Sequence, residues 1–200
     1  MDAEAWDDRY ASADQVWSLG PNQFVAEELK DLPPGTAVDL ACGEGRNALW
    51  LAEQGWTVTG VDFSEVAIDR AQQRDTDHAV TWVIGDALTA ELPDVDLAVI
   101  AYLQLPSDER RTAVRRAFAA LRPGGTLFVV AHDSTNLTEG TGGPQDPSVL
   151  YTADDVLADL DGAFDVVRAE RVPRRVTKAD EHGGEQDLTA WDSLVRVTRS

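Results

Sequence analysis

The sequence is poor in residue types that carry particular chemistries. Its 200 residues include one cysteine, Cys42, and only three histidines, which lie far apart in the chain. A single cysteine cannot form an intramolecular disulfide, and no cluster of cysteines and histidines has the spacing of a metal site. We therefore expect neither a disulfide framework nor a bound metal ion.

Positive charge is also scarce. The chain has 17 basic residues against 36 acidic ones, a formal net charge of -19, and only Lys30 and Lys178 are lysines. Such a negative field repels phosphate backbones, so we expect no nucleic-acid partner. The acidic surface is also explained by solubility alone or by a salt-rich cytoplasm, and the sequence does not separate these readings.

Long apolar runs are absent as well. No run approaches the roughly 20 residues that cross a bilayer, and the acidic first eight residues lack the shape of a signal peptide. We expect a cytoplasmic protein without membrane contact, either a monomer or a homodimer. The length suits one compact unit, with a helical segment over residues 1–35 that precedes the main domain over residues 36–200.

The most informative motif of the sequence is a glycine-rich turn. Residues 38–47 read Val-Asp-Leu-Ala-Cys-Gly-Glu-Gly-Arg-Asn, so a short apolar run meets Gly43 and Gly45 before a helical pattern begins. The next apolar run, residues 56–61, is followed by Asp62. A strand, a glycine turn, a helix and a second strand with a carboxylate at its end form half of a nucleotide-binding βαβ unit. A lone Gly-x-Gly only indicates a tight turn, and it is Asp62 at this spacing that favours a binding site.

Alternation of strands and helices continues along the chain. Apolar patterning predicts strands over residues 37–40, 57–61, 80–84, 96–101, 126–131, 164–172 and 193–198. Helical patterning covers residues 1–30 in two pieces, and further helices are expected over 46–54, 65–74, 107–121 and 152–160, with Ser64 and Ser107 as N-caps. Residues 132–150 are expected to be a long loop, and residues 174–188 a polar connection. The order predicts an α/β fold: a single Rossmann-like, doubly wound, mostly parallel sheet of seven strands that ends in an antiparallel hairpin.

With these motifs in order, the chain resembles class I S-adenosylmethionine-dependent methyltransferases. The resemblance rests on residues 39–45, Asp62, Gly85-Asp86-Ala87, residues 94–96 and Leu121-Arg-Pro-Gly-Gly125. The run from Cys42 to Asn47 and the aromatic N-terminal segment look most like small methyltransferases of the tellurite-resistance and thiopurine type. The family often has glycine where this chain has Ala41. We expect alanine to be tolerated there unless the backbone needs a positive φ.

The resemblance implies S-adenosylmethionine as cofactor, a small-molecule methyl acceptor, a helical lid segment over residues 1–35 and a cofactor-binding methyltransferase domain over residues 36–200. It also assigns roles to named residues. Asp39 would orient the turn or contact the ammonium group of the cofactor. Asp62 would accept hydrogen bonds from both ribose hydroxyls, and Phe63 would stack on adenine. The full set of expected cofactor-binding residues is Asp39, Ala41, Gly43, Gly45, Arg46, Asp62, Phe63, Ser64, Asp86, Ala87 and Ala101.

Contacts to the methyl acceptor are expected from Trp17, Tyr102, His132 and Arg174. Each of these has an ordinary structural alternative, such as a core aromatic or a solvated arginine. No clear general base stands out, which favours a soft or already ionised acceptor such as sulfur, selenium or tellurium.

Two other functions remain open. Gly43-x-Gly-x-x-Ala48 fits the dinucleotide fingerprint, so an NAD(P)-dependent oxidoreductase is one alternative, although no tyrosine is followed four residues later by a lysine. The other alternative is a non-catalytic S-adenosylmethionine-binding module that serves a partner protein.

Overall fold

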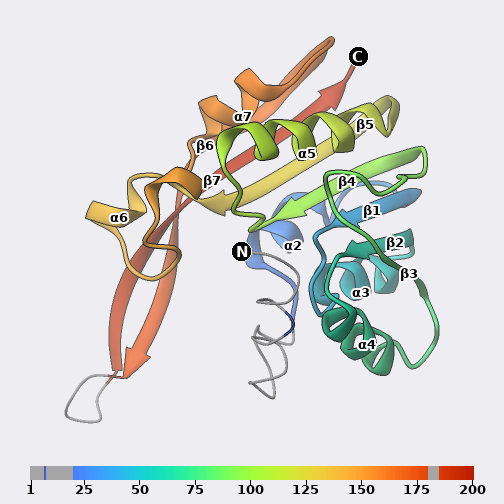
Figure 1. Cartoon of the computed structure of the whole chain (residues 1–200), viewed down its shortest axis with the longest axis horizontal. Coiled ribbons are helices and arrows are strands. Elements are labelled where there is room, and N and C mark those ends of the chain that lie inside the picture. The colour runs from blue at the N-terminus through green and yellow to red at the C-terminus, as the bar shows by residue number, and fades with distance from the viewer. Residues whose placement is uncertain (1–6, 8–19, 180–184) are drawn as a thin grey trace.

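A computed structural model describes residue 7 and residues 20–179 and 185–200 (Figure 1). Of the expected lid segment, Trp17 and most of residues 1–19 lie outside these ranges. The described part of the segment contains α2 (Gln23–Leu29), whose first turn is capped by the side chain of Asn22. Two backbone amides, those of Phe24 and Val25, donate to Asn22 Oδ1 at 2.9 and 3.3 Å.

The predicted sheet of seven strands is confirmed. The strands are β1 (Thr36–Leu40), β2 (Thr57–Asp62), β3 (Val80–Ile84), β4 (Val95–Ala101), β5 (Leu121–His132), β6 (Phe164–Ala179) and β7 (Glu185–Arg199). Their order in space is β3-β2-β1-β4-β5-β7-β6, with β7 antiparallel to both of its neighbours. The order reverses between β1 and β4, and ligands of doubly wound sheets bind outside the carboxyl ends of the strands at such a switch point.

Helices cover both faces of the sheet. They are α3 (Arg46–Glu53), α4 (Glu65–Arg74), α5 (Ser107–Ala119), α6 (Asn136–Glu139) and α7 (Ala153–Asp159). In Figure 1, α5 and α7 lie on one side of the sheet, and α2, α3 and α4 lie on the other.

Strand residues alternate between these two layers. Leu97 and Val99 of β4 pack in the core beside α2 and α3, whereas Ala98 and Ile100 pack in the core beside α5 and α7. Because Asp39 lies between Val38 and Leu40, which face the α5 side, its carboxylate faces the α3 side.

The terminal hairpin differs from the prediction. Residues 174–188 were expected to be a polar connection, but β6 continues to Ala179 and β7 begins at Glu185, and the two strands pair out to these residues, with one register shift between Val166 and Arg168. The hairpin extends well beyond the rest of the sheet (Figure 1). Its outer part is mostly charged and polar, with few and scattered apolar residues, so the pattern lacks the continuous apolar face by which strands are recognised.

Smaller differences concern element ends. Residues 122–125 were expected to be a turn, yet β5 begins at Leu121, which pairs with Val95 ahead of a register shift. Pro106, and not Ser107, is the N-cap residue of α5. Residues 132–150 were expected to be a long loop, but they include α6 and a short 3-10 helix over Pro147–Val149. None of the helices in the described residues is long and apolar enough to span a membrane.

Candidate active site

The turn after β1 is built from left-handed backbone. Ala41, Gly43 and Gly45 have φ angles of 59°, 55° and 75°, and α3 begins directly afterwards at Arg46. A Cβ atom on Gly45 would lie 2.3 Å from the Trp82 ring, so this position has no room for a side chain. Alanine at position 41 was expected to be tolerated unless the backbone there needs a positive φ, and that condition is met, because an L-residue with this φ costs about 1–2 kcal/mol.

Asp62 joins this turn to the end of β2. Its Oδ2 accepts a hydrogen bond from the Gly43 amide at 2.8 Å, and its Oδ1 accepts from the Ser64 amide at 3.0 Å. The side chain is buried, and burial raises the pKa of the carboxyl group while the amides of Ser64 and Gly43 oppose that rise. Each carboxylate oxygen can accept more than one hydrogen bond, so Asp62 still has acceptor capacity for a ligand.

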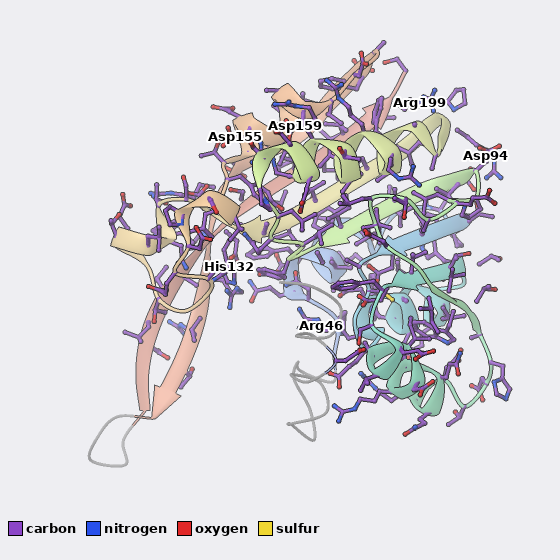
Figure 2. All side chains as sticks on the ribbon, in the orientation of Figure 1. Arg46, Asp94, His132, Asp155, Asp159 and Arg199 are labelled. Carbon is purple, nitrogen blue, oxygen red and sulfur yellow. The ribbon has the colours of Figure 1, made fainter. Side chains whose placement is uncertain are left out.

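Asp39 lies behind the same turn and is 1% exposed. Neither of its carboxylate oxygens has a hydrogen-bond partner of good geometry among the described residues. Burial raises its pKa to about 7, although the Ala48 backbone amide and the nearby Arg46 guanidinium lower it and Asp62 raises it further. The structure therefore places a carboxyl group of unusually high proton affinity beside the glycine turn, and Figure 2 shows Arg46 at the start of α3.

Ser64 has a structural role as the N-cap of α4. Its hydroxyl accepts the Ala67 amide at 3.1 Å, as the sequence pattern predicted, and it also hydrogen bonds to Asp7. Asp7 additionally accepts from the Val66 amide at 3.4 Å. A residue of the N-terminal segment thus lies at the start of α4, next to the Asp62 end of β2.

The residues expected around adenine are less constrained. Phe63 is half-buried, and the exposed Asp86 accepts the Leu88 amide at 2.8 Å, which closes its own loop. Ala87 packs against the core on the α5 side. The Gly85 amide donates to the Asp62 carbonyl at 2.8 Å, which brings the ends of β2 and β3 together. The adenine contacts of Phe63, Asp86 and Ala87 stay predictions.

A second cluster lies at the carboxyl ends of β4 and β5. Ala101 ends β4, and Tyr102 follows with a φ of 60°, which is rare for an aromatic residue and indicates local backbone strain. The rings of Tyr102 and His132 are 4.9 Å apart between centroids, and the Arg174 guanidinium lies 5.6 Å from the Tyr102 ring centroid. The three described residues that were expected to contact the acceptor are therefore together.

Asp192 on β7 unites this cluster, and sequence reasoning missed it. The Tyr102 hydroxyl donates to its Oδ2 at 2.8 Å, and Arg174 Nε donates to the same oxygen at 2.6 Å. His132 Nδ1 lies 3.2 Å from its Oδ1, an ion-pair distance whose angles fall short of a hydrogen bond. The signal that could have found Asp192 is strand alternation, which places it on the same face as the buried Leu194.

The electrostatics of this cluster follow from its burial. Burial works to raise the pKa of the Asp192 carboxyl, but His132, Arg174 and Tyr102 outweigh burial and hold that pKa below its usual range. Burial and the Asp192 carboxylate raise the pKa of Tyr102. Bonding to Asp192 raises the pKa of Arg174 against the opposing effect of burial. Tyr102 is therefore a neutral donor, and Asp192 and Arg174 are a fixed pair of opposite charges.

Comparisons with known proteins identify relatives of this chain by sequence and by fold. Residues 37–125 match the family model described as "Methyltransferase domain". An uncharacterized methyltransferase of Mycobacterium tuberculosis is 36% identical over 130 residues, which cover 64% of this chain and 66% of the relative. The match thus spans slightly less than two thirds of that relative's own length.

Two further comparisons extend over more of the chain. A thiopurine S-methyltransferase of Vibrio cholerae is 27% identical over 165 residues, 72% of this chain and 75% of the relative. The solved structure of the N-methyltransferase NodS from Bradyrhizobium japonicum, in complex with S-adenosyl-L-homocysteine, covers 100% of this chain and 99% of its own. The two folds agree with a TM-score of 0.72 at 23% sequence identity.

Proposed function

We propose that this chain, which belongs to the class I S-adenosylmethionine-dependent methyltransferases, transfers the methyl group of S-adenosylmethionine to a heteroatom of a small molecule. When bound, the sulfonium supplies a methyl group that is already activated toward nucleophiles. The protein's contribution is then to bind, to orient the two reactants and to exclude water, and orientation alone can contribute roughly 7–11 kcal/mol.

One observation carries the proposal: the buried Asp62 carboxylate, at the end of the strand next to the switch point, holds the glycine turn and retains acceptor capacity. These residues fit the cofactor. Asp62 would accept from the ribose hydroxyls, and the left-handed backbone at Gly43 and Gly45 lets main chain approach the amino-acid part. The two carboxylate oxygens of Asp39, which lack partners among the described residues, fit a nearby cationic ammonium group.

The acceptor site is proposed at the Tyr102, His132 and Arg174 cluster. Soft sulfur, selenium or tellurium nucleophiles are the first class to test, and the similarity to a thiopurine S-methyltransferase supports including sulfur. The net charge of -19 supports a small molecule over a polyanionic nucleic acid. We also propose that the protein acts in the cytoplasm as a monomer or homodimer.

The first experiment is calorimetric titration with S-adenosylmethionine and S-adenosylhomocysteine, with NADH and NADPH as controls. Binding of the first pair but not the second supports the proposal, and Asp62→Ala should abolish it. Binding of a nicotinamide cofactor in its place would establish the oxidoreductase alternative. A protein that binds S-adenosylmethionine yet methylates none of a panel of thiols, phenols and amines would instead be a binding module.

A further inference from the structure

The His132 side chain is held in one orientation from several directions. Its Nδ1 lies 3.2 Å from Asp192 Oδ1, and the Tyr102 ring lies against it at 4.9 Å between centroids. Its backbone amide donates to Gln104 Oε1 at 2.8 Å. Figure 2 shows His132 where β5 ends and the hairpin leaves the body of the sheet, at the opposite end of the sheet from Asp94. His132 is therefore a positioned group at the edge where the acceptor would bind.

The loop after β5 completes this arrangement. A Cβ atom on Gly143 would lie 2.9 Å from the His132 ring, so the main chain at Gly143 contacts the imidazole. Asn136 fixes the loop, because its Nδ2 donates to the Gly142 carbonyl at 2.9 Å and its Oδ1 accepts the Trp191 amide at 2.8 Å. A segment that the sequence marked only as long and polar thus holds the ring against Asp192.

The two ring nitrogens of His132 have different surroundings. Nδ1 is fully buried and faces Asp192, whose side chain is 0% exposed. Nε2 makes no hydrogen bond to any residue that the structure describes, and the side chain keeps 14% of its surface exposed. A carboxylate beside one nitrogen of an imidazole favours the proton there and leaves the lone pair on the other nitrogen.

The other polar groups of the cluster are unsuited to take a proton. The Tyr102 hydroxyl already donates to Asp192 at 2.8 Å, and the Arg174 guanidinium remains protonated. Asp192 Oδ2 accepts hydrogen bonds from Tyr102 and Arg174, and Asp192 Oδ1 faces His132. Among the described residues of this cluster, His132 is the one left with a lone pair that can accept a proton.

We propose that His132 is the general base of the reaction and that Asp192 and Gly143 are positioning residues that hold it. The inference rests on the proposed function and extends its acceptors, from the soft nucleophiles that need no base, to a hydroxyl or amine that still carries a proton when it binds. In the step, the acceptor heteroatom gives its proton to Nε2 and bonds to the methyl carbon. The carbon–sulfur bond breaks with its electron pair left on sulfur, and His132 then releases the proton to solvent.

The first test needs no cofactor. The chain has three histidines, so nitrogen-15 NMR of the imidazoles, assigned with His132→Gln, reads the tautomer of His132 directly. We expect the neutral ring to carry its proton on Nδ1, and we expect Asp192→Asn to shift the proton toward Nε2. A wild-type ring with its proton on Nε2 would overturn the proposal.

The second test compares matched acceptors that differ only in the reacting atom, such as a phenol and the corresponding thiophenol, which is largely ionised at neutral pH. His132→Gln should lower kcat for the phenol by about 10²- to 10⁴-fold with little change in KM, the usual contribution of a general base. The thiophenol should be almost unaffected, and added imidazole should partly restore phenol methylation in His132→Gly. Asp187→Asn, on the exposed outer part of the same hairpin, is the control that should change neither rate.

The outcomes separate this inference from the proposed function. Equal losses on both acceptors without rescue, or a wild type that methylates thiols but no hydroxyl or amine, would overturn the role of His132 and leave methyl transfer intact. Absence of S-adenosylmethionine binding in the wild type would instead overturn the proposed function, whatever tautomer the ring adopts.

Discussion

The Gly43 backbone amide donates to Oδ2 of Asp62 at 2.8 Å, which ties the turn after β1 to the end of β2. Nineteen residues of sequence separate the two groups. The bond means that one carboxylate both shapes the glycine turn and lies at the carboxyl end of β2, where the cofactor is proposed to bind. Substitutions at Asp62 are therefore expected to affect the turn and the cofactor together.

Asp62→Asn should weaken S-adenosylmethionine binding about 10- to 100-fold, because hydrogen bonds to a charged acceptor are worth roughly 1.5–3 kcal/mol. Asparagine keeps one acceptor oxygen, so the turn should survive better than in Asp62→Ala. Calorimetry gives the Kd, and Asp94→Asn, exposed at the far end of β4, is the matched control (Figure 2). An unchanged Kd in Asp62→Asn would show that this carboxylate does not hold the ribose.

Asp39 should make the free energy of unfolding depend on pH. Its folded pKa of about 7 lies above the usual value of 3.8 for an aspartate, so the folded state binds the proton more tightly. Below the unfolded pKa, ionisation of Asp39 does not lower the free energy of unfolding. Between the unfolded and the folded pKa the loss of stability grows with pH, and above the folded pKa it reaches its full size of about 4 kcal/mol. Urea denaturation from pH 4 to 8 should show Asp39→Asn gaining stability relative to wild type as pH rises. A constant difference across that range would contradict the burial argument.

Cofactor binding should release protons near neutral pH. A cationic ligand beside Asp39 favours its ionised form, so a group with a pKa of about 7 loses about half a proton on binding at that pH. Calorimetric titrations in two buffers of different ionisation enthalpy measure this release. Asp39→Asn should remove it, and proton release that persists in that variant would assign it to another group.

Ala41→Gly should stabilise the protein by about 0.5–1 kcal/mol. The left-handed φ of 59° costs alanine about 1–2 kcal/mol, and the greater unfolded-state freedom of glycine offsets part of the gain. Thermal unfolding monitored by circular dichroism provides the measurement. Ala158→Gly, at an exposed position of α7, is the opposite control and should lose about 0.5–1 kcal/mol. A loss of stability in Ala41→Gly would show that the alanine methyl group has a packing role there.

The half of the chain around β1 and β2 could be predicted because its determinants are local. Apolar strands covered on both faces read as unbroken runs, and the glycines and Asp62 lie at fixed spacings within one βαβ unit. The extent of the hairpin could not be predicted, because residues 174–188 are held by pairing between β6 and β7 and not by an apolar pattern of their own.

The sequence by itself determined the fold class, the turn at Gly43 and Gly45 and the carboxylate at Asp62, because these depend on periodicity and short spacing. Only the tertiary structure decided that Tyr102, His132 and Arg174 meet at Asp192. The four residues come from four segments that are as much as 90 residues apart in the sequence. The tertiary structure also decided that Ala41 adopts a left-handed backbone and that Asp39 faces the α3 side without a hydrogen-bond partner among the described residues. Burial and the partners of a charged group are properties of packing, so no reading of local sequence could supply them.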